Sequence, residues 1–265
     1  MSASARFWQV DAFTDRPFAG NPAAVLLLDE ALPDATMAAI AAENNLAETA
    51  FVEPAGADGV FGLRWFTPTV EIALCGHATL ASGHVLLGED PARDAVRFRT
   101  RQAGELEVRR ASAGYAMDLP AWGTAPRALP QIVAALGASG EPETQWRDGG
   151  YAVVVLPDEA AVRALRPDFA GLTACGNVLT IATAPGDATD VASRVFAPGA
   201  GIDEDHVTGS AHAVIAGYWA ERLGRTGFSA FQTSARGGRM EVELAGDRVT
   251  LQGKCVTVIE GRFRF

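Results

Sequence analysis

One pattern occurs twice in this chain, and each copy joins a short strand to a helix through a proline and a glycine. The first copy comprises residues 64–68 (Arg-Trp-Phe-Thr-Pro) and 75–79 (Cys-Gly-His-Ala-Thr). The second comprises residues 194–198 (Arg-Val-Phe-Ala-Pro) and 208–212 (Thr-Gly-Ser-Ala-His). An apolar run follows each copy, and proline and glycine are typical of the end of a strand and the entry to a helix. The pattern therefore predicts two similar halves, each with a helix that begins at a glycine.

The two predicted helix starts are suited to binding an anion. The first turn of a helix leaves backbone N–H groups without intrahelical partners and carries the positive end of the helix dipole, which suits a carboxylate or a developing oxyanion. Either glycine alone would indicate only the start of a helix, but the matched pair favours a functional cleft. We expect Gly76 and His77 to face Gly209 and Ser210 across an inter-domain cleft.

Length and composition place the chain among ordinary globular proteins. Its 265 residues are 48% hydrophobic and 20% charged, enough for one large domain or two small ones. Residues 120–130 contain three prolines and a glycine and are the best linker candidate. We therefore predict an N-terminal half at 1–120 and a C-terminal half at 130–265, with the last strand free to pack back on the N-terminal half.

Net charge, hydrophobic run length and cysteine number indicate which partners and which redox environment the protein is expected to have. The formal charge of -10, from 22 basic and 32 acidic residues without a basic run, argues against a nucleic-acid surface. No apolar run is long enough to span a membrane. Cys75, Cys175 and Cys255 are well separated and odd in number, which favours reduced thiols. We expect a cytoplasmic protein that binds neither nucleic acid nor membrane. A homodimer is the oligomeric state that we consider for it.

Local patterns predict an α/β class with a buried helix in each half. The segments 78–87 and 211–219 are apolar or small on nearly every side, which is typical of a buried helix. Other patterns predict helices over 34–41, 129–136 and 158–165, strands over 7–13, 23–28, 48–52, 60–66, 151–156, 178–184 and 256–259, and hairpins over 96–108 and 240–251. We expect short strands to surround each central helix.

All four histidines, His77, His84, His206 and His212, lie in the two repeated regions. Their spacings match no familiar zinc signature, so a metal site is not favoured. We expect His84 and His212 to be hydrogen-bonded residues on helices. His77 differs because it lies in the first helical turn at the predicted cleft.

Glu48 is the acidic residue most indicative of function. It is the only charged residue between Asn44 and Val52. A carboxyl group in an apolar pocket resists ionisation, which suits it to general acid/base work near neutral pH. The alternative is an exposed residue at the start of a strand.

Three further acids precede the second helix. We interpret Asp203 and Glu204 as charges that favour the helix dipole. Asp205, nearest the turn, is expected to position a substrate or to orient His77.

Two residues are candidate nucleophiles. Ser210 is not in a Gly-x-Ser-x-Gly elbow, so we interpret it as a hydrogen-bond donor at the helix start. Cys75 could be a thiolate activated by the adjacent helix end. Its counterpart in the second copy is Thr208, which cannot act as a base at neutral pH.

Five segments together resemble the PhzF family, named for phenazine biosynthesis. They are 10–13 (Val-Asp-Ala-Phe), 20–23 (Gly-Asn-Pro-Ala), 44–51, 75–79 and 204–212, in matching order over essentially the full chain. The resemblance implies the diaminopimelate-epimerase fold, in which two similar α/β halves each wrap a curved, barrel-like sheet around a central helix. The active site of that fold lies between the halves.

The resemblance also implies roles for particular residues. It implies an isomerase that moves a proton on a small carboxylate-bearing substrate, such as a dihydro-hydroxyanthranilate, without metal or organic cofactor. The catalytic residues would be Glu48, His77 and Asp205, and Gly209 and Ser210 would bind substrate at the second helix start. We expect Cys75, Gly76 and Ala211, beside these residues, to bind substrate as well. Two alternatives stay open: a catalytically inactive metabolite-binding protein and a cysteine-dependent amino-acid epimerase. The epimerases of this fold use two cysteines, which disfavours the latter here.

Overall fold

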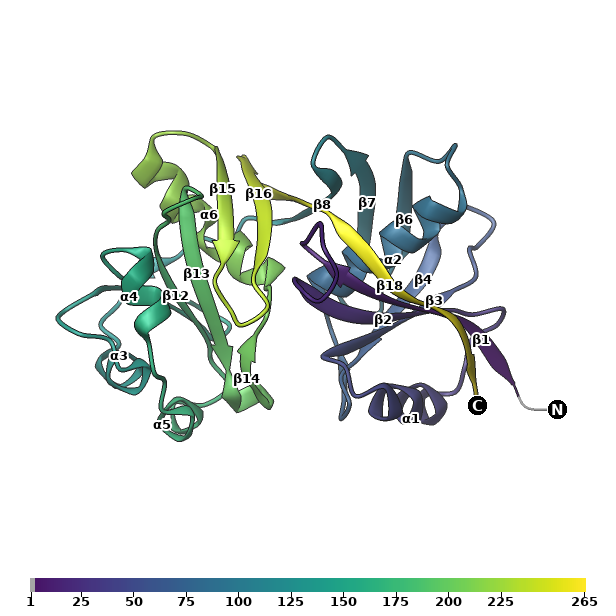
Figure 1. Ribbon diagram of the computed structural model, residues 1–265, viewed down its shortest axis with the longest axis horizontal. Coiled ribbons are helices and arrows are strands. Elements are labelled where there is room, and N and C mark those ends of the chain that lie inside the picture. Colours follow the sequence, from purple (N-terminus) through teal and green to yellow (C-terminus); the bar gives the residue numbers. More distant parts are fainter. Residues whose placement is uncertain (1–2) are drawn as a thin grey trace. The chain divides into compact units, whose positions relative to one another are not determined.

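The chain forms two compact units in a computed structural model that describes residues 3–265 (Figure 1). The first unit contains the residues up to Asp118 together with Gln252–Phe265, and the second contains Leu119–Leu251. The chain passes into the second unit within β8 (Gly114–Pro120) and returns within β17 (Arg248–Gly253).

The first unit is a mixed sheet with two helices. Its strands pair in the order β18, β1, β2, β3, β4, β6, β7, β8, and all pairs are antiparallel except β2/β3 and β4/β6. A helix connects each parallel pair, as such a crossover requires: α1 (Asp34–Asn44) joins β2 to β3 and α2 (Gly76–Glu89) lies between β4 and β6. The strands are β1 (Ser4–Ala12), β2 (Asn21–Leu27), β3 (Glu48–Glu53), β4 (Phe61–Phe66), β5 (Glu71–Ile72), β6 (Ala95–Arg99), β7 (Glu105–Ala111) and β18 (Cys255–Arg264).

The second unit repeats this connectivity. Its strands pair in the order β9, β10, β11, β12, β13, β15, β16, with β11/β12 and β13/β15 parallel and the others antiparallel. The strands are β9 (Ala125–Pro126), β10 (Glu143–Arg147), β11 (Tyr151–Val155), β12 (Leu179–Pro185), β13 (Val191–Ala197), β14 (Ile202–Asp205), β15 (Gly227–Gln232) and β16 (Gly238–Ala245). The helices are α3 (Pro130–Leu136), α4 (Glu159–Ala164), α5 (Phe169–Ala174) and α6 (Gly209–Leu223), with a 3-10 turn at Pro198–Ala200.

The matched connectivity explains the repeated sequence pattern. In the first unit the pattern spans β4, β5 and the start of α2, and in the second it spans β13, β14 and the start of α6. The predicted α/β class, with two similar halves and a central helix in each, is confirmed.

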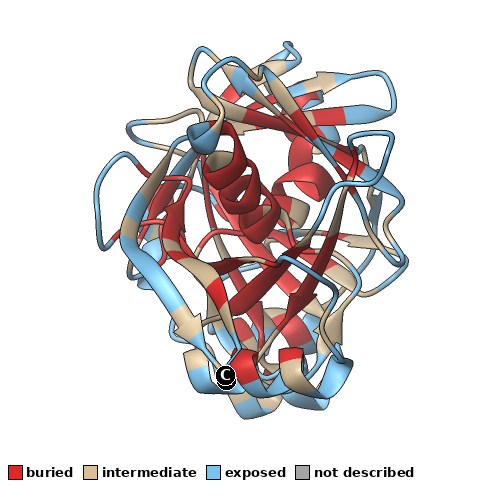
Figure 2. Ribbon diagram, turned by 90° about the vertical axis from the view of Figure 1, so that its right-hand side faces the viewer, coloured by how far each residue is buried: buried red, intermediate tan, exposed pale blue. Residues whose placement is uncertain are grey.

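Helix α2 lies among strands and is buried on nearly every side. It contacts β1, β2, β3, β6, β7 and β18, and Figure 2, which faces the first unit, shows a helix coloured as buried between strands. Gly83 permits this packing, because a Cβ atom at this position would collide with the buried side chain of Val108 in β7. In the second unit, Trp219 of α6 is buried and donates a hydrogen bond to Thr183 Oγ1 at 3.0 Å.

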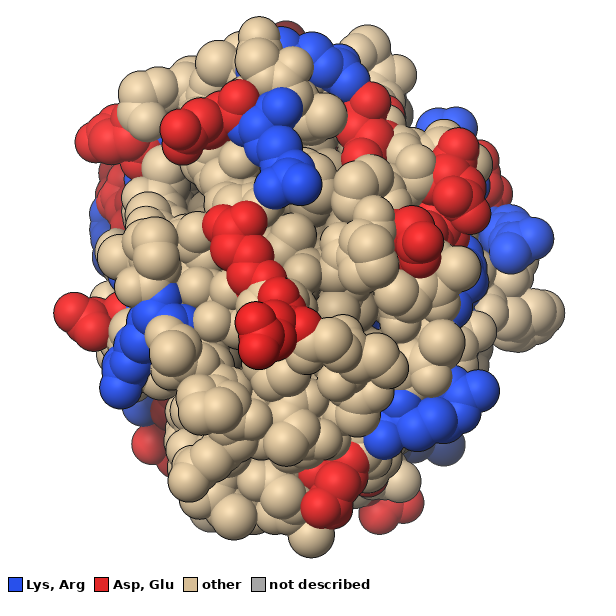
Figure 3. Space-filling view, turned by 90° about the vertical axis from the view of Figure 1, so that its left-hand side faces the viewer, with Lys and Arg blue, Asp and Glu red and all other residues tan. Residues whose placement is uncertain are grey.

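The surface carries both signs of charge. On the face shown in Figure 3, acidic and basic side chains are interspersed instead of gathering by sign. Across residues 3–265, no helix is both long enough and apolar enough to cross a membrane.

Candidate active site

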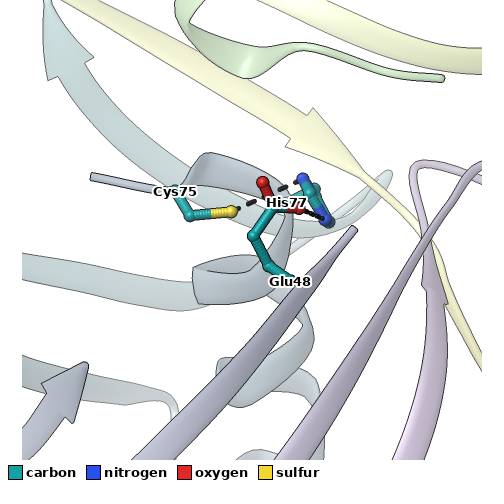
Figure 4. A group of neighbouring side chains, drawn as sticks. All are labelled: Glu48, Cys75 and His77. Carbon is teal, nitrogen blue, oxygen red and sulfur yellow. Dashed lines mark hydrogen bonds and ion pairs between the residues drawn. The ribbon is translucent and has the colours of Figure 1, made fainter. Parts of the chain in front are cut away.

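Glu48 and His77 meet at the start of the central helix of the first unit. Glu48 is the first residue of β3 and His77 the second residue of α2. Both are buried, and Glu48 Oε2 lies 3.0 Å from His77 Nε2 (Figure 4). This is ion-pair distance, but the two atoms are not aligned as in a hydrogen bond, and neither makes another hydrogen bond with the residues that the structure describes.

The other ring nitrogen of His77 has two neighbours. His77 Nδ1 lies 3.2 Å from Asn21 Nδ2 and 3.5 Å from Cys75 Sγ. Asn21 is fully buried at the first position of β2, which runs parallel to β3 with Ala23 opposite Glu48. In the neutral imidazole, an Asn21 amide that donates to Nδ1 leaves the ring proton on Nε2, facing the carboxylate, whereas in the protonated ring both nitrogens are donors.

The neighbouring charges in this group shift the pKa values of Cys75 and His77. Burial alone would lower the pKa of His77, but the negative charges of Cys75 and Glu48 outweigh burial and raise that pKa well above 6.5. Burial, together with the charge of Glu48, raises the pKa of the Cys75 thiol.

The start of α6 in the second unit is built on Thr208. Its hydroxyl donates to Asp205 Oδ2 at 2.5 Å, and its backbone N–H donates to Gln232 Oε1 at 2.8 Å. The Gln232 amide in turn donates to the carbonyl of Asp205 at 2.7 Å. Gln232, the last residue of β15, thus fixes the turn that leads from Asp205 into the helix.

The two helix starts have the same local geometry. Cys75 precedes α2 with φ −138° and ψ 112°, and Thr208 precedes α6 with φ −116° and ψ 101°. In each helix, a side chain four residues on donates to the carbonyl of that preceding residue: Thr79 Oγ1 to Cys75 at 2.5 Å, and His212 Nδ1 to Thr208 at 2.8 Å. Cys75 and Thr208 are therefore equivalent, and the second unit has no thiol at this place.

Two interpretations of the surrounding residues can be checked directly. The prediction that Glu204 serves the helix dipole is wrong, because its carboxylate binds the Arg194 guanidinium through two contacts of 2.8 Å. His84 is hydrogen-bonded as predicted, with Nδ1 3.0 Å from the Tyr115 hydroxyl and Nε2 2.9 Å from Thr257 Oγ1. The same holds for His212.

The predicted site residues fall into two groups. Glu48, Cys75, Gly76 and His77 lie together in the first unit, whereas Asp205 lies beside the start of α6 with Gly209, Ser210 and Ala211 in the second. The predicted cleft, with one helix start facing the other, stays a prediction. Neither Asn21 nor Gln232 was predicted to be a site residue. Asn21 lies in the Gly-Asn-Pro-Ala segment that resembles the PhzF family, which could have indicated it. Gln232 lies in no segment with such a resemblance.

The same first-unit group could hold a metal ion. Single donor atoms of Glu48, Cys75 and His77 all lie within 4.8 Å of one another, and all three residues are buried. A carboxylate, a thiolate and an imidazole are donors that zinc accepts in proteins.

Comparison with known proteins agrees with this architecture. A family described as phenazine biosynthesis-like protein matches residues 10–261. An uncharacterised isomerase of Pseudomonas aeruginosa is 50% identical over 256 residues, which cover 96% of each chain. A PhzF-family protein of Enterococcus faecalis superposes with a TM-score of 0.91 at 40% identity, covering 98% of this chain and 99% of the other.

A more distant structure supports the fold alone. A hydroxyproline epimerase of Agrobacterium vitis superposes with a TM-score of 0.58 at 13% identity, over 98% of this chain and 92% of the other. The predicted diaminopimelate-epimerase-like fold is confirmed by these likenesses. The family match over nearly the whole chain, together with the close relatives, shows that the chain belongs to the phenazine biosynthesis-like, or PhzF, family.

Proposed function

We propose that the protein is an isomerase that moves a proton between two carbon atoms of a small carboxylate-bearing substrate resembling a dihydro-hydroxyanthranilate. The observation that carries the proposal is the buried Glu48 carboxylate 3.0 Å from His77 Nε2 at a helix start. The names of close relatives support an isomerase. In this mechanism the proton carrier is a side chain, and no cofactor takes part.

The reaction needs a base that becomes an acid within one turnover. Glu48 removes a proton from a carbon atom of the substrate, which leaves a delocalised anion, and then returns the proton to a second carbon atom. His77, whose pKa is raised, keeps its proton throughout and faces the Glu48 carboxyl group at 3.0 Å. The proton count is unchanged, so the reaction is an isomerisation.

The helix starts are proposed to hold the substrate. The N–H groups at Gly76 and at Gly209 to Ala211 lie in first helical turns, where backbone donors have no intrahelical partner. A substrate carboxylate and the charge that develops in the transition state are both stabilised by such donors. Asp205 is proposed to contact the substrate, with Thr208 fixing its carboxylate.

The proposal is tested by substituting Glu48. Glu48→Gln keeps the shape of the side chain but cannot carry the proton. We expect turnover to fall by roughly 100- to 10,000-fold, the contribution of a general acid/base group, while substrate binding is retained. Glu53→Gln, at the other end of β3, is the matched control and should keep full turnover. Unchanged turnover in Glu48→Gln would remove this residue from the mechanism.

The two alternatives make different predictions. Incubation with dihydro-hydroxyanthranilate-like acids in deuterated water separates the enzyme from a pure metabolite-binding protein, because only the enzyme brings deuterium onto carbon. A cysteine-dependent epimerase requires Cys75 as a thiolate. The raised pKa of that thiol and the threonine at the equivalent position of the second unit both favour proton transfer by Glu48.

A further inference from the structure

We propose that Glu48, Cys75 and His77 form a site for a single zinc ion, and that zinc bound there inhibits turnover. The first half of this proposal rests on geometry alone. The second half rests on the proposed function, because it assumes that Glu48 is the proton carrier.

The donor set is the first argument. Thiolate sulfur, imidazole nitrogen and carboxylate oxygen are all common zinc ligands, and sites with three protein ligands leave a fourth position for water or another small ligand. The three side chains converge on one place from β3 and the start of α2 (Figure 4). The histidine spacings do not reveal the site, because only one of the three donors is a histidine.

The unsatisfied polar atoms are the second argument. Glu48 Oε2 and His77 Nε2 are both buried and, within residues 3–265, neither has a hydrogen bond besides their mutual contact. An ion that binds both atoms therefore displaces no other hydrogen bond and gives each buried atom a strong partner. The two atoms are 3.0 Å apart, which is near the separation of about 3.3 Å expected for two tetrahedral ligands at zinc bond lengths.

The third ligand needs a small adjustment. The donor atoms lie within 4.8 Å of one another, and a zinc–sulfur bond would bring Cys75 Sγ to about 3.6 Å from the other ligands. Cys75 Sγ now lies 3.5 Å from His77 Nδ1, so it must move toward the Nε2 side of the ring to complete the site. Asn21 Nδ2 lies 3.2 Å from His77 Nδ1. Turning the amide by 180° would bring its carbonyl oxygen to Nδ1, where it can accept a hydrogen bond from Nδ1–H once Nε2 binds the metal, as outer partners of zinc-bound histidines do.

The test is a titration of the purified full-length chain with zinc in competition with a coloured chelator. We expect one zinc ion per chain in the wild type. Cys75→Ser should weaken binding by more than the roughly 10- to 100-fold that follows loss of an outer partner, whereas Cys175→Ser, which changes a thiol in the second unit, should bind like the wild type. Equal affinity in the wild type and Cys75→Ser would overturn the proposal.

Cobalt provides a measurement that does not depend on a variant folding. Cobalt(II) bound to the wild type should show a thiolate-to-metal charge-transfer band in the near ultraviolet, and absence of this band at full cobalt occupancy would also overturn the site. Turnover should decline in proportion to zinc occupancy and return with a chelator. If Glu48→Gln retains turnover, the proposed function is wrong. The zinc site is tested separately, because the zinc titration does not depend on turnover.

Discussion

Arg64 and Arg194 occupy equivalent positions in the two units and make the same contact. The Arg64 guanidinium binds both carboxylate oxygens of Glu71 at 2.8 Å, and the Arg194 guanidinium binds both oxygens of Glu204 at 2.8 Å. Each arginine also lies over the phenylalanine ring two positions further along its strand. Each ion pair joins the strand before the central helix to the short strand, β5 or β14, that leads toward the helix start. The repeated arginine therefore braces the loop that positions each helix start.

The Arg64–Glu71 ion pair of the first unit is predicted to contribute to the stability of the protein. The side chain of Arg64 is 6% exposed and that of Glu71 is 23% exposed. Breaking a buried pair costs about 3–5 kcal/mol, and because Glu71 reaches solvent we expect Arg64→Gln to lower the free energy of unfolding by about 2 kcal/mol. Denaturant unfolding measures this change. Arg99→Gln is the control, since the side chain of Arg99 is 55% exposed and ion pairs in solvent contribute little to stability. Equal losses in the two variants would contradict a bracing role.

Asn21 is predicted to be a positioning residue for His77. Asn21→Ala removes the contact of 3.2 Å to Nδ1, so the ring is free to place its proton on either nitrogen. We expect kcat to fall by about 10- to 100-fold, the range for loss of an orienting partner of a functional histidine, with KM little changed. Asn44→Ala removes a hydrogen bond of similar length, 3.1 Å to Thr49, and should leave kcat near the wild-type value. The proton position on His77, measured by NMR, should change only in the Asn21 variant.

Cys75 is predicted to take no part in the proton transfer itself. Its thiol is buried and its pKa is raised, so it should react slowly with alkylating reagents near neutral pH, more slowly than the partly exposed Cys175. Cys75→Ala should keep most of its proton-transfer activity. Mass spectrometry of partially alkylated protein gives the order of reaction, and turnover assays give the effect of the substitution. Loss of all activity in Cys75→Ala would instead support the thiol epimerase.

The repeat and the buried helices could be predicted from sequence because their signals are local. Proline, glycine and an unbroken apolar run lie within about 25 residues in each copy, so no long-range contact is needed to recognise them. The burial of Glu48 could be predicted on a similar basis, and the residue is 7% exposed, but the carboxylate contacts the polar His77 and not only apolar side chains. Strands β10 and β15 were not predicted, because neither has a strong pattern of its own and both are defined by pairing with neighbours.

The contacts that organise each helix start could not be predicted, because they join distant residues. Asn21 and His77 are 56 positions apart, and Thr208 and Gln232 are 24 apart. A single polar residue in a strand pattern does not identify its partner until the sheet order is known. Glu204 was misinterpreted for the same reason, since its position just before a helix suggested a dipole contact, whereas the strand pairing of β13 with β14 brings it to Arg194.

His212 is predicted to make the stability of the protein depend on pH. It is fully buried, with Nδ1 2.8 Å from the carbonyl of Thr208 and Nε2 3.2 Å from Ser193 Oγ. Burial lowers its pKa from 6.5 to about 4. Between these two values the unfolded chain binds a proton that the folded chain does not, so the free energy of unfolding decreases as the pH falls from 6.5 to about 4.

The expected loss over this window is about 3 kcal/mol, since each pKa unit corresponds to about 1.4 kcal/mol. His77 acts in the opposite direction: its pKa is raised, so its contribution is fully present below 6.5 and is lost only as the pH rises through the folded value. His212→Gln, which keeps hydrogen-bonding groups but cannot titrate, isolates the effect. Denaturant unfolding of this variant at several pH values should show a shallower decline than the wild type below pH 6.5. Parallel curves for the two proteins would show that His212 is not the group responsible.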